Sequence, residues 1–356
     1  MDHAMEQALA AYERGEFARA LTIWREFAHN GSATAMKWLG VLHENGHGVP
    51  TDLQEAFRWY KRAAEAGNCA AQNNLGLMLE RGKGVEKNDS EALHWYRRSA
   101  EQGDAFGKFL FGLMILHGKG TPKDERLGWE LMTEAAEQGN AEAQVNLGVR
   151  YAQGDGLAQD PVQAVAWMKK AADQGHPKAL FNLGTFYQSG KGVPANPPRA
   201  VECFTQSAAA GSREACFNLG VIYDQGLGVP ADAVKAFEWF RKGAELGHAP
   251  AQVQMGVLLV QGKGVPRDPE GAASWIQRAA QQGDPQGQFS YGFLNETGTG
   301  MEVDVVSAYM WYLLAAAQGH PLAKKRTELM VREKRISADE LSEARHLVAN
   351  WGRTLD

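Results

Sequence analysis

The chain of 356 residues has few cysteines, and they lie far apart in the sequence. Cys69, Cys203 and Cys216 are too few for a disulfide framework, and such sparse use is typical of a reducing compartment. Cys203 and Cys216 fall on consecutive expected helices, so a bridge between them is an open alternative. Burial as small apolar side chains fits both positions better.

The chain also lacks an excess of positive charge, a long apolar run and a secretory signal. Lys and Arg number 37 against 42 Asp and Glu, which gives no basic surface for nucleic acid. No stretch approaches the roughly 18 apolar residues of a membrane span. The N-terminus shows no basic segment followed by an apolar one. We therefore expect no nucleic-acid partner, no membrane span and a cytoplasmic location, with signal-independent secretion as an open alternative.

What the chain does have is glycine at a constant spacing. One series recurs every 36 residues without a slip: Gly40, Gly76, Gly112, Gly148, Gly184, Gly220, Gly256 and Gly292. A second series runs from Gly31 to Gly319, and a Gly-x-Gly pair runs from Gly46/Gly48 to Gly298/Gly300, both at the same step. Eight copies without insertion indicate one supersecondary unit that is stacked eight times.

The segment 140–175 shows what one unit contains. Small and apolar residues in its first half, including Leu147 and Tyr151, recur at helical spacing, and its second half does the same. Between the halves, Gly154 suits the end of a helix and Pro161 suits the first turn of the next. Each unit is therefore predicted to be a helix, a turn and a second helix.

The glycine in the middle of the first helix predicts how the units pack. Glycine there costs about 1 kcal/mol relative to alanine, so its recurrence implies that a neighbouring backbone lies too close for a side chain. Most copies carry a tryptophan in the second helix, as at Trp167. The third and fifth copies carry Leu131 and Cys203 instead, so we expect these two units to pack differently.

These residues follow the pattern A-x-x-x-L-G-x-x-Y-x-x-G-x-G-V…A-x-x-W-Y-x-x-A-A-x-x-G, which resembles the Sel1-like repeat, a relative of the tetratricopeptide repeat. The resemblance covers residues 32–319. Residues 1–31 resemble a plain tetratricopeptide unit and are expected to form an N-terminal cap. Residues 320–356, with a capping box at Ser337 and Glu340, are expected to form C-terminal capping helices. We therefore expect an all-α, right-handed α-solenoid, or superhelix, of helix-turn-helix repeats.

Two short motifs are explained by the repeat. The segment from His43 to His47 matches the zinc-protease pattern H-E-x-x-H, but Gly46 should end the helix and place His47 in the turn. Gly-Lys-Gly occurs at 82–84, 118–120, 190–192 and 262–264, where no strand precedes it, so these lysines are expected to be solvated turn residues. We therefore expect no metal site and no cofactor.

The first helix of each repeat carries two neighbouring rows of chemical interest. The Asn row comprises Trp38, Asn74, Leu110, Asn146, Asn182, Asn218, Gln254 and Ser290, and the Phe row comprises Lys37, Asn73, Phe109, Val145, Phe181, Phe217, Val253 and Phe289. The resemblance to tetratricopeptide stacks implies that first helices line a concave groove. Carboxamides both donate and accept hydrogen bonds, so they can bind an extended peptide backbone, while aromatic residues hold its apolar side chains.

The predicted peptide-binding residues are therefore Asn74, Asn146, Asn182, Asn218, Phe109, Phe181, Phe217 and Phe289. Lys178 and Arg150 could add a clamp for a terminal carboxylate, although the set is incomplete. An alternative stays open, in which the asparagines bond to the neighbouring repeat and the phenylalanines belong to the core between helices.

The predicted function is a non-catalytic scaffold that binds a protein or peptide partner in its groove. One alternative is a hydrolase of the β-lactamase-like kind, since some secreted, cysteine-rich members of the family are linked to β-lactams. This chain lacks their paired cysteines and any Ser-x-x-Lys. Another alternative is a scaffold for carbohydrate or envelope assembly. We expect no enzyme activity and no catalytic residues.

Overall fold

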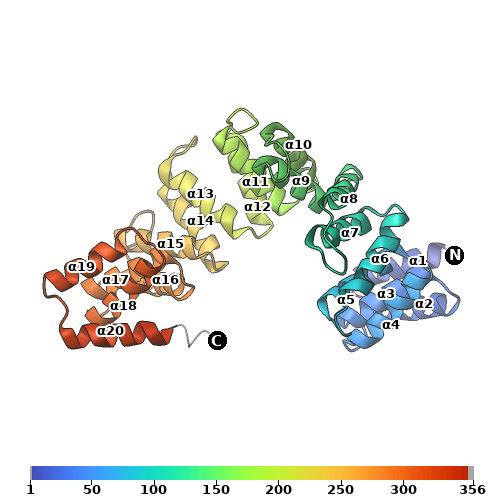
Figure 1. The fold of residues 1–356 in the computed structure, drawn as a ribbon, viewed down its shortest axis with the longest axis horizontal. Helices are drawn as coiled ribbons and strands as arrows, with labels where there is room; N and C mark the ends of the chain where they lie inside the picture. The colour runs from blue at the N-terminus through green and yellow to red at the C-terminus, as the bar shows by residue number, and fades with distance from the viewer. Residues whose placement is uncertain (1, 352–356) are drawn as a thin grey trace. The chain divides into compact units, whose positions relative to one another are not determined.

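The computed structural model describes residues 2–351, and within them it contains twenty α-helices and no strand (Figure 1). The helices are α1 (Asp2–Glu13), α2 (Phe17–His29), α3 (Ala33–Asn45), α4 (Leu53–Glu65), α5 (Cys69–Arg81), α6 (Asp89–Glu101), α7 (Ala105–His117), α8 (Glu125–Glu137), α9 (Ala141–Gln153), α10 (Pro161–Ala172), α11 (Pro177–Ser189), α12 (Pro197–Ala209), α13 (Arg213–Gln225), α14 (Ala233–Glu245), α15 (Ala249–Gln261), α16 (Pro269–Gln281), α17 (Pro285–Thr297), α18 (Val305–Ala317), α19 (Ala323–Arg332) and α20 (Ala338–Trp351).

The helices belong to two compact units. The first unit, Met1–Gln174, contains α1 to α10, and the second, Gly175–Asp356, contains α11 to α20. In each unit, helices that follow one another along the chain pack as antiparallel neighbours, as in an α-solenoid, up to α19; α20 packs on α18 instead. None of the described helices is long and apolar enough to cross a membrane.

Helix boundaries follow from the capping residues of each repeat. In the fourth repeat α9 ends at Gln153, and Gly154 adopts the left-handed conformation with φ of 76°. Asp160 then caps α10, accepting hydrogen bonds from the backbone N–H groups of Val162 and Gln163, both at 3.0 Å. Pro161 occupies the first turn of α10. The predicted helix, turn and helix are confirmed.

The mid-helix glycines do mark close packing, but the neighbour is a side chain. A Cβ on Gly220 would lie 2.5 Å from two ring carbons of Phe240, and one on Gly40 would lie 2.5 Å from ring carbons of Tyr60. Only at Gly112 is the nearest atom backbone, the carbonyl oxygen of Gly128 at 3.0 Å. The prediction of a close backbone was therefore wrong in most copies, because the second helix fills the space with an aromatic, Met or Ile side chain.

The third repeat packs differently, as predicted, and the fifth keeps the usual aromatic contact at its mid-helix glycine. In the third repeat Trp129 replaces the usual tryptophan and lies against Arg150 of α9, with 4.1 Å from Cζ to the ring centroid. In the fifth repeat Phe204 lies over Gly184 as Phe240 lies over Gly220. All three cysteines are free, so the alternative of a bridge between Cys203 and Cys216 is not realised.

Buried glutamines connect one repeat to the next. The side chain of Gln144 is 3% exposed and donates to the Ala136 carbonyl at 3.0 Å, while Gln174 donates to Gln144 Oε1 at 2.9 Å. The same partnership joins Gln72 to Gln102, Gln252 to Gln282 and Gln288 to Gln318. Where the buried position is apolar, its partner position is apolar too: Met36 with Ala66, Leu180 with Ala210 and Cys216 with Leu246.

Two helices follow the last repeat and pack on α18. The predicted capping box is present, since the Ser337 N–H donates to Glu340 Oε2 at 2.7 Å and the Glu340 N–H donates to Ser337 Oγ at 3.3 Å. Trp351 of α20 meets Trp311 edge to face at 4.6 Å. Residues 352–356 of the expected C-terminal cap lie outside the described residues.

Candidate functional site

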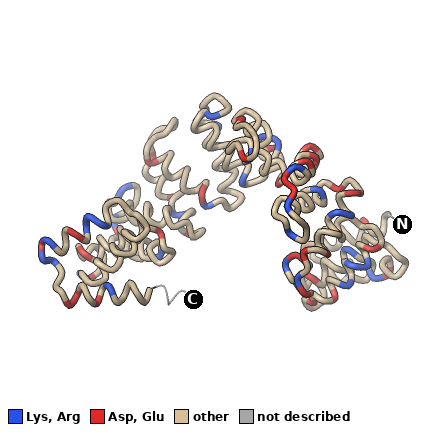
Figure 2. The backbone as a smooth tube through the Cα atoms, viewed as in Figure 1, with Lys and Arg blue, Asp and Glu red and all other residues tan. Residues whose placement is uncertain are grey.

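The first helices of the repeats lie on the inner side of each unit. Contacts between α5 and α7, and between α15 and α17, are more extensive than those between any two neighbouring second helices described. These contacts fit the expectation, from the resemblance to tetratricopeptide stacks, that first helices line the inner face of such an array. Lys, Arg, Asp and Glu are interspersed along most of the chain, with a concentration of acidic residues on α8 (Figure 2).

The Phe row contributes first to packing between helices. Phe109 is buried, with 7% of its surface exposed. The other three predicted phenylalanines are half-buried against an aromatic residue of their own second helix, at centroid distances of 5.7 Å for Phe181 and Phe204, 5.8 Å for Phe217 and Phe240, and 5.4 Å for Phe289 and Tyr312. The alternative in which this row is core therefore holds in part, and a role of these residues in binding stays a prediction.

The Asn row is half-buried on the first helices, at Asn74, Asn146, Asn182 and Asn218. Asn146 Nδ2 donates to the Glu142 carbonyl of its own helix at 2.8 Å, which leaves Oδ1 able to accept. Asn74 interacts with the Tyr60 hydroxyl of the preceding repeat, and in the Phe row Asn73 Nδ2 donates to Asp104 Oδ2 of the following repeat at 2.8 Å. A peptide-binding role for the Asn row stays a prediction.

Two hollows on the first helices of the second unit are lined by residues of both rows. The first has a volume of 480 Å³ and lies between α11 and the turn that precedes α13. Phe181, Asn182 and Lys178 line it on one side, and Ser212 and Glu214 line it on the other. It therefore offers an aromatic ring, a carboxamide and charges of both signs together.

The second hollow has a volume of 200 Å³ and is apolar. It lies between α15 and α17, with Phe289 and Ser290 from the two rows and Phe293 one turn further on. Val260 and Ile276 form part of its wall. The Phe293 side chain is 44% exposed, which is unusual for a large apolar residue and suits contact with a partner.

Two wall residues of the apolar hollow stand where three other repeats carry a polar pair. In the first, second and eighth repeats a glutamate of the first helix accepts a hydrogen bond from a tyrosine of the second: Tyr60 to Glu44 at 2.7 Å, Tyr96 to Glu80 at 3.1 Å and Tyr312 to Glu296 at 2.7 Å. Val260 and Ile276 occupy these positions in the seventh repeat. The replacement is visible when the sequences of the repeats are aligned and both positions are compared together, and it is missed when each position is compared alone.

Three of the four Gly-Lys-Gly lysines are not merely solvated turn residues, and that prediction is corrected here. Each pairs with a carboxylate on the first helix of the preceding repeat: Lys83 with Glu44 at 2.8 Å, Lys119 with Glu80 at 2.7 Å and Lys263 with Asp224 at 2.5 Å. Burial opposes the ionisation of Glu44, but hydrogen bonds from Lys83 and Tyr60 hold its pKa below the usual value.

The zinc-protease pattern is divided by the end of a helix. Helix α3 ends at Asn45, and Gly46 has φ of 72° and caps it, so His47 lies in the turn as predicted. Nδ1 of His47 is 3.0 Å from the Tyr12 hydroxyl, and its ring stacks on Phe17 at 4.5 Å. Within residues 2–351, no group of three or more His, Cys, Asp or Glu side chains has an arrangement that could hold a metal.

Antiparallel helix pairs repeated at a pitch of 36 residues define a protein of the tetratricopeptide-like class. The family model described as "Sel1 repeat" matches eight segments: 33–68, 69–104, 109–140, 141–176, 177–212, 213–248, 249–284 and 285–320. The chain belongs to the Sel1 repeat family. Proteins of this family generally act as protein-interaction scaffolds.

Two solved structures are similar to this chain over most of its length. The c5321 protein, a protective antigen present in uropathogenic Escherichia coli strains displaying an SLR fold, is 34% identical, with a TM-score of 0.78 over 98% of this chain and 75% of its own. A Sel1 repeat protein from Oxalobacter formigenes is 32% identical, with a TM-score of 0.65 over 86% of this chain and 90% of its own. Curated proteins give no significant match. None of these comparisons supports the hydrolase or the carbohydrate alternative.

Proposed function

We propose that the protein is a non-catalytic scaffold that holds an extended segment of a partner protein along the inner face of its first helices. The free thiols of its three cysteines are compatible with the cytoplasmic location expected from the sequence. The partner is expected to be a protein or peptide, because the surface offers separate subsites rather than one enclosed cavity.

The observation that supports the proposal best is the apolar hollow between α15 and α17. It accepts an apolar side chain, and the half-exposed ring of Phe293 stands at its edge. Such a pocket on an otherwise polar face is typical of an anchor site for one partner residue. Its wall includes Val260 and Ile276, at the positions where the first, second and eighth repeats carry glutamate and tyrosine.

The hollow at α11 supplies the polar half of the proposed site. Asn182 and Lys178 lie beside the ring of Phe181, so a peptide backbone and an adjacent side chain can both be contacted there. Both hollows belong to the second unit.

Site-specific photo-crosslinking tests which face binds. A photoreactive phenylalanine analogue replaces Phe293 or Lys178, which line the two hollows. The matched controls place it at Val234 and Glu238, both exposed on the second helix α14. In cells of the native host, we expect a discrete protein adduct from the first pair of positions and none from the control pair.

The Asn row is tested in the same cells by replacing Asn146, Asn182 and Asn218 with alanine. We expect the adduct at Phe293 to fall several-fold while the circular dichroism spectrum is unchanged. Adducts from α14 alone, or none from either hollow, would remove the inner face from the proposed function. An undiminished adduct in the triple variant would remove only the Asn row.

A further inference from the structure

Arg150 of α9 occupies a position that is apolar and buried in every other repeat. Its counterparts are each at most 9% exposed: Leu42, Met78, Met114, Phe186, Ile222, Leu258 and Leu294. A guanidinium in a core row loses hydration and packing, so its presence needs a compensating contact. Burial lowers the pKa of Arg150, which fits its half-buried position.

The turn after α9 is also displaced from its usual contact. In six other copies a Cβ on the second glycine of Gly-x-Gly would collide with the residue 31 positions earlier: Gly48, Gly84, Gly120, Gly228, Gly264 and Gly300. At Gly156 the only atom within 4 Å would be Nη2 of Arg150, at 3.5 Å. The turn therefore does not contact Glu125, which holds the corresponding position of α8. A hollow of 540 Å³ lies between the turn and Glu125.

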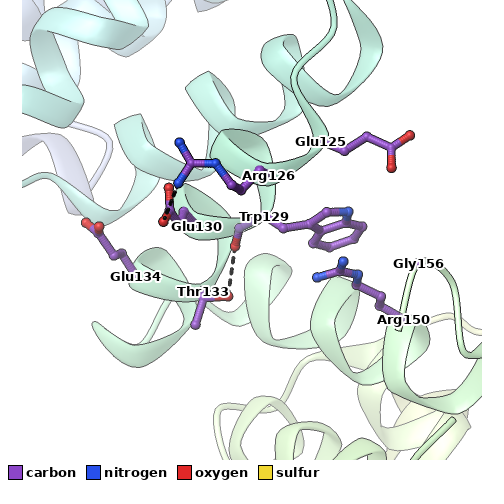
Figure 3. Close-up of a pocket in the computed structure, with 8 residues that line it drawn as sticks. All are labelled: Glu125, Arg126, Trp129, Glu130, Thr133, Glu134, Arg150 and Gly156. Carbon is purple, nitrogen blue, oxygen red and sulfur yellow. Dashed lines mark hydrogen bonds and ion pairs between the residues drawn. The ribbon is translucent and has the colours of Figure 1, made fainter. Parts of the chain in front are cut away.

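The side chains of Trp129 and Arg150 face each other in this hollow (Figure 3). The guanidinium lies over the indole at 4.1 Å, and its Nε donates to the Asp155 carbonyl at 3.0 Å. These two contacts hold the guanidinium plane while both Nη groups keep their capacity to donate. A smaller hollow of 250 Å³ shares Trp129 and Glu125 and extends to Asn146 of the Asn row.

The charges around Arg150 are already paired with one another. Glu125 contacts Lys123 at 2.6 Å, Glu130 contacts Arg126 at 3.4 Å and Glu134 contacts Lys108 at 2.7 Å. Among the described residues of this unit, no carboxylate forms an ion pair with Arg150. Asp155 and Glu125 act on Arg150 from nearby without forming an ion pair, so its Nη groups stay able to donate, and the surrounding carboxylates disfavour a doubly charged ligand.

We propose that this hollow receives one carboxylate side chain, aspartate or glutamate, from the partner segment, with both Nη groups of Arg150 donating to its oxygens. A planar guanidinium matches the two oxygens of a carboxylate. The methylene part of the side chain lies along Trp129, and Asn146 Oδ1 accepts from the partner backbone in the adjoining hollow. This assignment rests on the proposed function, because it specifies one residue of the same partner.

Binding is measured by nuclear magnetic resonance with small probes, so no partner is needed. The probe is N-acetylglutamate α-amide, which carries one carboxylate, and the matched control is the neutral N-acetylglutamine α-amide. The observed signals are the indole N–H of Trp129 and the Nε–H of Arg150. We expect saturable shifts with the carboxylate probe, with a Kd on the order of 10 mM, and none with the control. Inorganic phosphate should bind more weakly than the carboxylate probe.

Arg150→Met restores the residue type of two counterparts, so this variant should fold at least as stably as the natural chain. We expect it to weaken probe binding at Trp129 at least about 10-fold. Lys169→Gln, an exposed residue on α10, makes the same change of charge in the same unit and should leave binding unchanged. Equal shifts from the neutral control, retained binding in Arg150→Met, or no saturable shift would each overturn the assignment.

The outcome separates this inference from the proposed function. Crosslinking at Phe293 with no response to the carboxylate probe leaves the scaffold standing and removes the carboxylate site. If Trp129 and Arg150 respond to the probe but no crosslink forms on the inner face, the carboxylate site stands and the proposed scaffold function is removed.

Discussion

The hydroxyl of Tyr312 donates a 2.7 Å hydrogen bond to Oε2 of Glu296, whose side chain is only 6% exposed. Arg326 of α19 donates to both carboxylate oxygens of Glu296 at 2.8 Å, and Arg335 approaches Oε1 at 3.2 Å. One carboxylate thus connects the last repeat to α19 and to the turn that follows α19.

Glu296 is predicted to stabilise this connection in a pH-dependent way. Burial opposes its ionisation, but Arg326 and Tyr312 hold its pKa below the usual value. Because the folded pKa is the lower one, its stabilising contribution is present above the unfolded pKa and disappears as the pH falls through the folded pKa. Glu296→Gln should lower the free energy of unfolding by about 1–3 kcal/mol near neutral pH. The difference should shrink as the pH falls below the ordinary glutamate pKa of about 4.3, and it should vanish only below the lower pKa of the folded protein.

Urea unfolding of both chains, followed by tryptophan fluorescence, measures this effect. Glu302→Gln is the control, because Glu302 is exposed and should leave the midpoint unchanged. An equal loss in Glu296→Gln at acidic and neutral pH would show that shape, not charge, is what matters at this position.

Gly220→Ala should destabilise the protein even though alanine favours helix by about 1 kcal/mol over glycine. The added Cβ would lie 2.5 Å from the Phe240 ring, so we expect a net loss of about 1–3 kcal/mol. Adding Phe240→Leu to Gly220→Ala should recover part of the lost stability, because the smaller side chain leaves space for the added Cβ. Thermal unfolding of the single and double variants tests this, and a stabilised Gly220→Ala would contradict the packing argument.

The buried glutamine pair should behave as a unit. Gln144→Met alone removes a donor from the buried Ala136 carbonyl and leaves Gln174 without its acceptor, so we expect a loss of about 1–3 kcal/mol. Gln144→Met with Gln174→Ala copies the natural pair Met36 and Ala66. The double variant should therefore be more stable than the sum of the single changes predicts. Strict additivity in a double-mutant cycle would show that the two side chains are not coupled.

The three thiols should differ in reactivity. Cys203 and Cys216 are 8% and 1% exposed, and burial raises the pKa of both. Cys69 is half-buried, and burial raises its pKa as well. With a disulfide reagent near pH 8 we expect Cys69 to react first and the other two only on unfolding, because the thiolate must be both formed and reached. Equal rates for all three in the native protein would contradict this burial.

Much of the fold could be predicted from the sequence because the signals are local. Gly154 and Pro161 mark the ends of neighbouring helices, and the pairing of Ser337 with Glu340 marks the start of the last one. The side-chain contacts between helices were harder to predict, because they connect different rows. Lys83 and Glu44 are 39 residues apart, and Gln174 and Gln144 are 30 apart, so comparing each row with itself misses both pairs.

The candidate site was predicted less well, for a physical reason. A hollow depends on which side chains are small or missing around it, as at Val260 and Ile276, and no motif describes that combination. Phe109 fits the pattern of a groove residue but is covered by its neighbours. Arg150 was visible as the one charged residue in an apolar row, and this signal could have identified its surroundings.

The matched glutamine pairs have a consequence for how such a chain can change. Both members of a pair lie in the same 36-residue unit, as Met36 and Ala66 do, so a unit that is duplicated or exchanged carries its own matched pair with it. The lysines of the turns find their carboxylates in the adjacent unit instead, as Lys83 does with Glu44. Recombination of whole units is therefore expected to preserve the first kind of contact and to put only the second at risk.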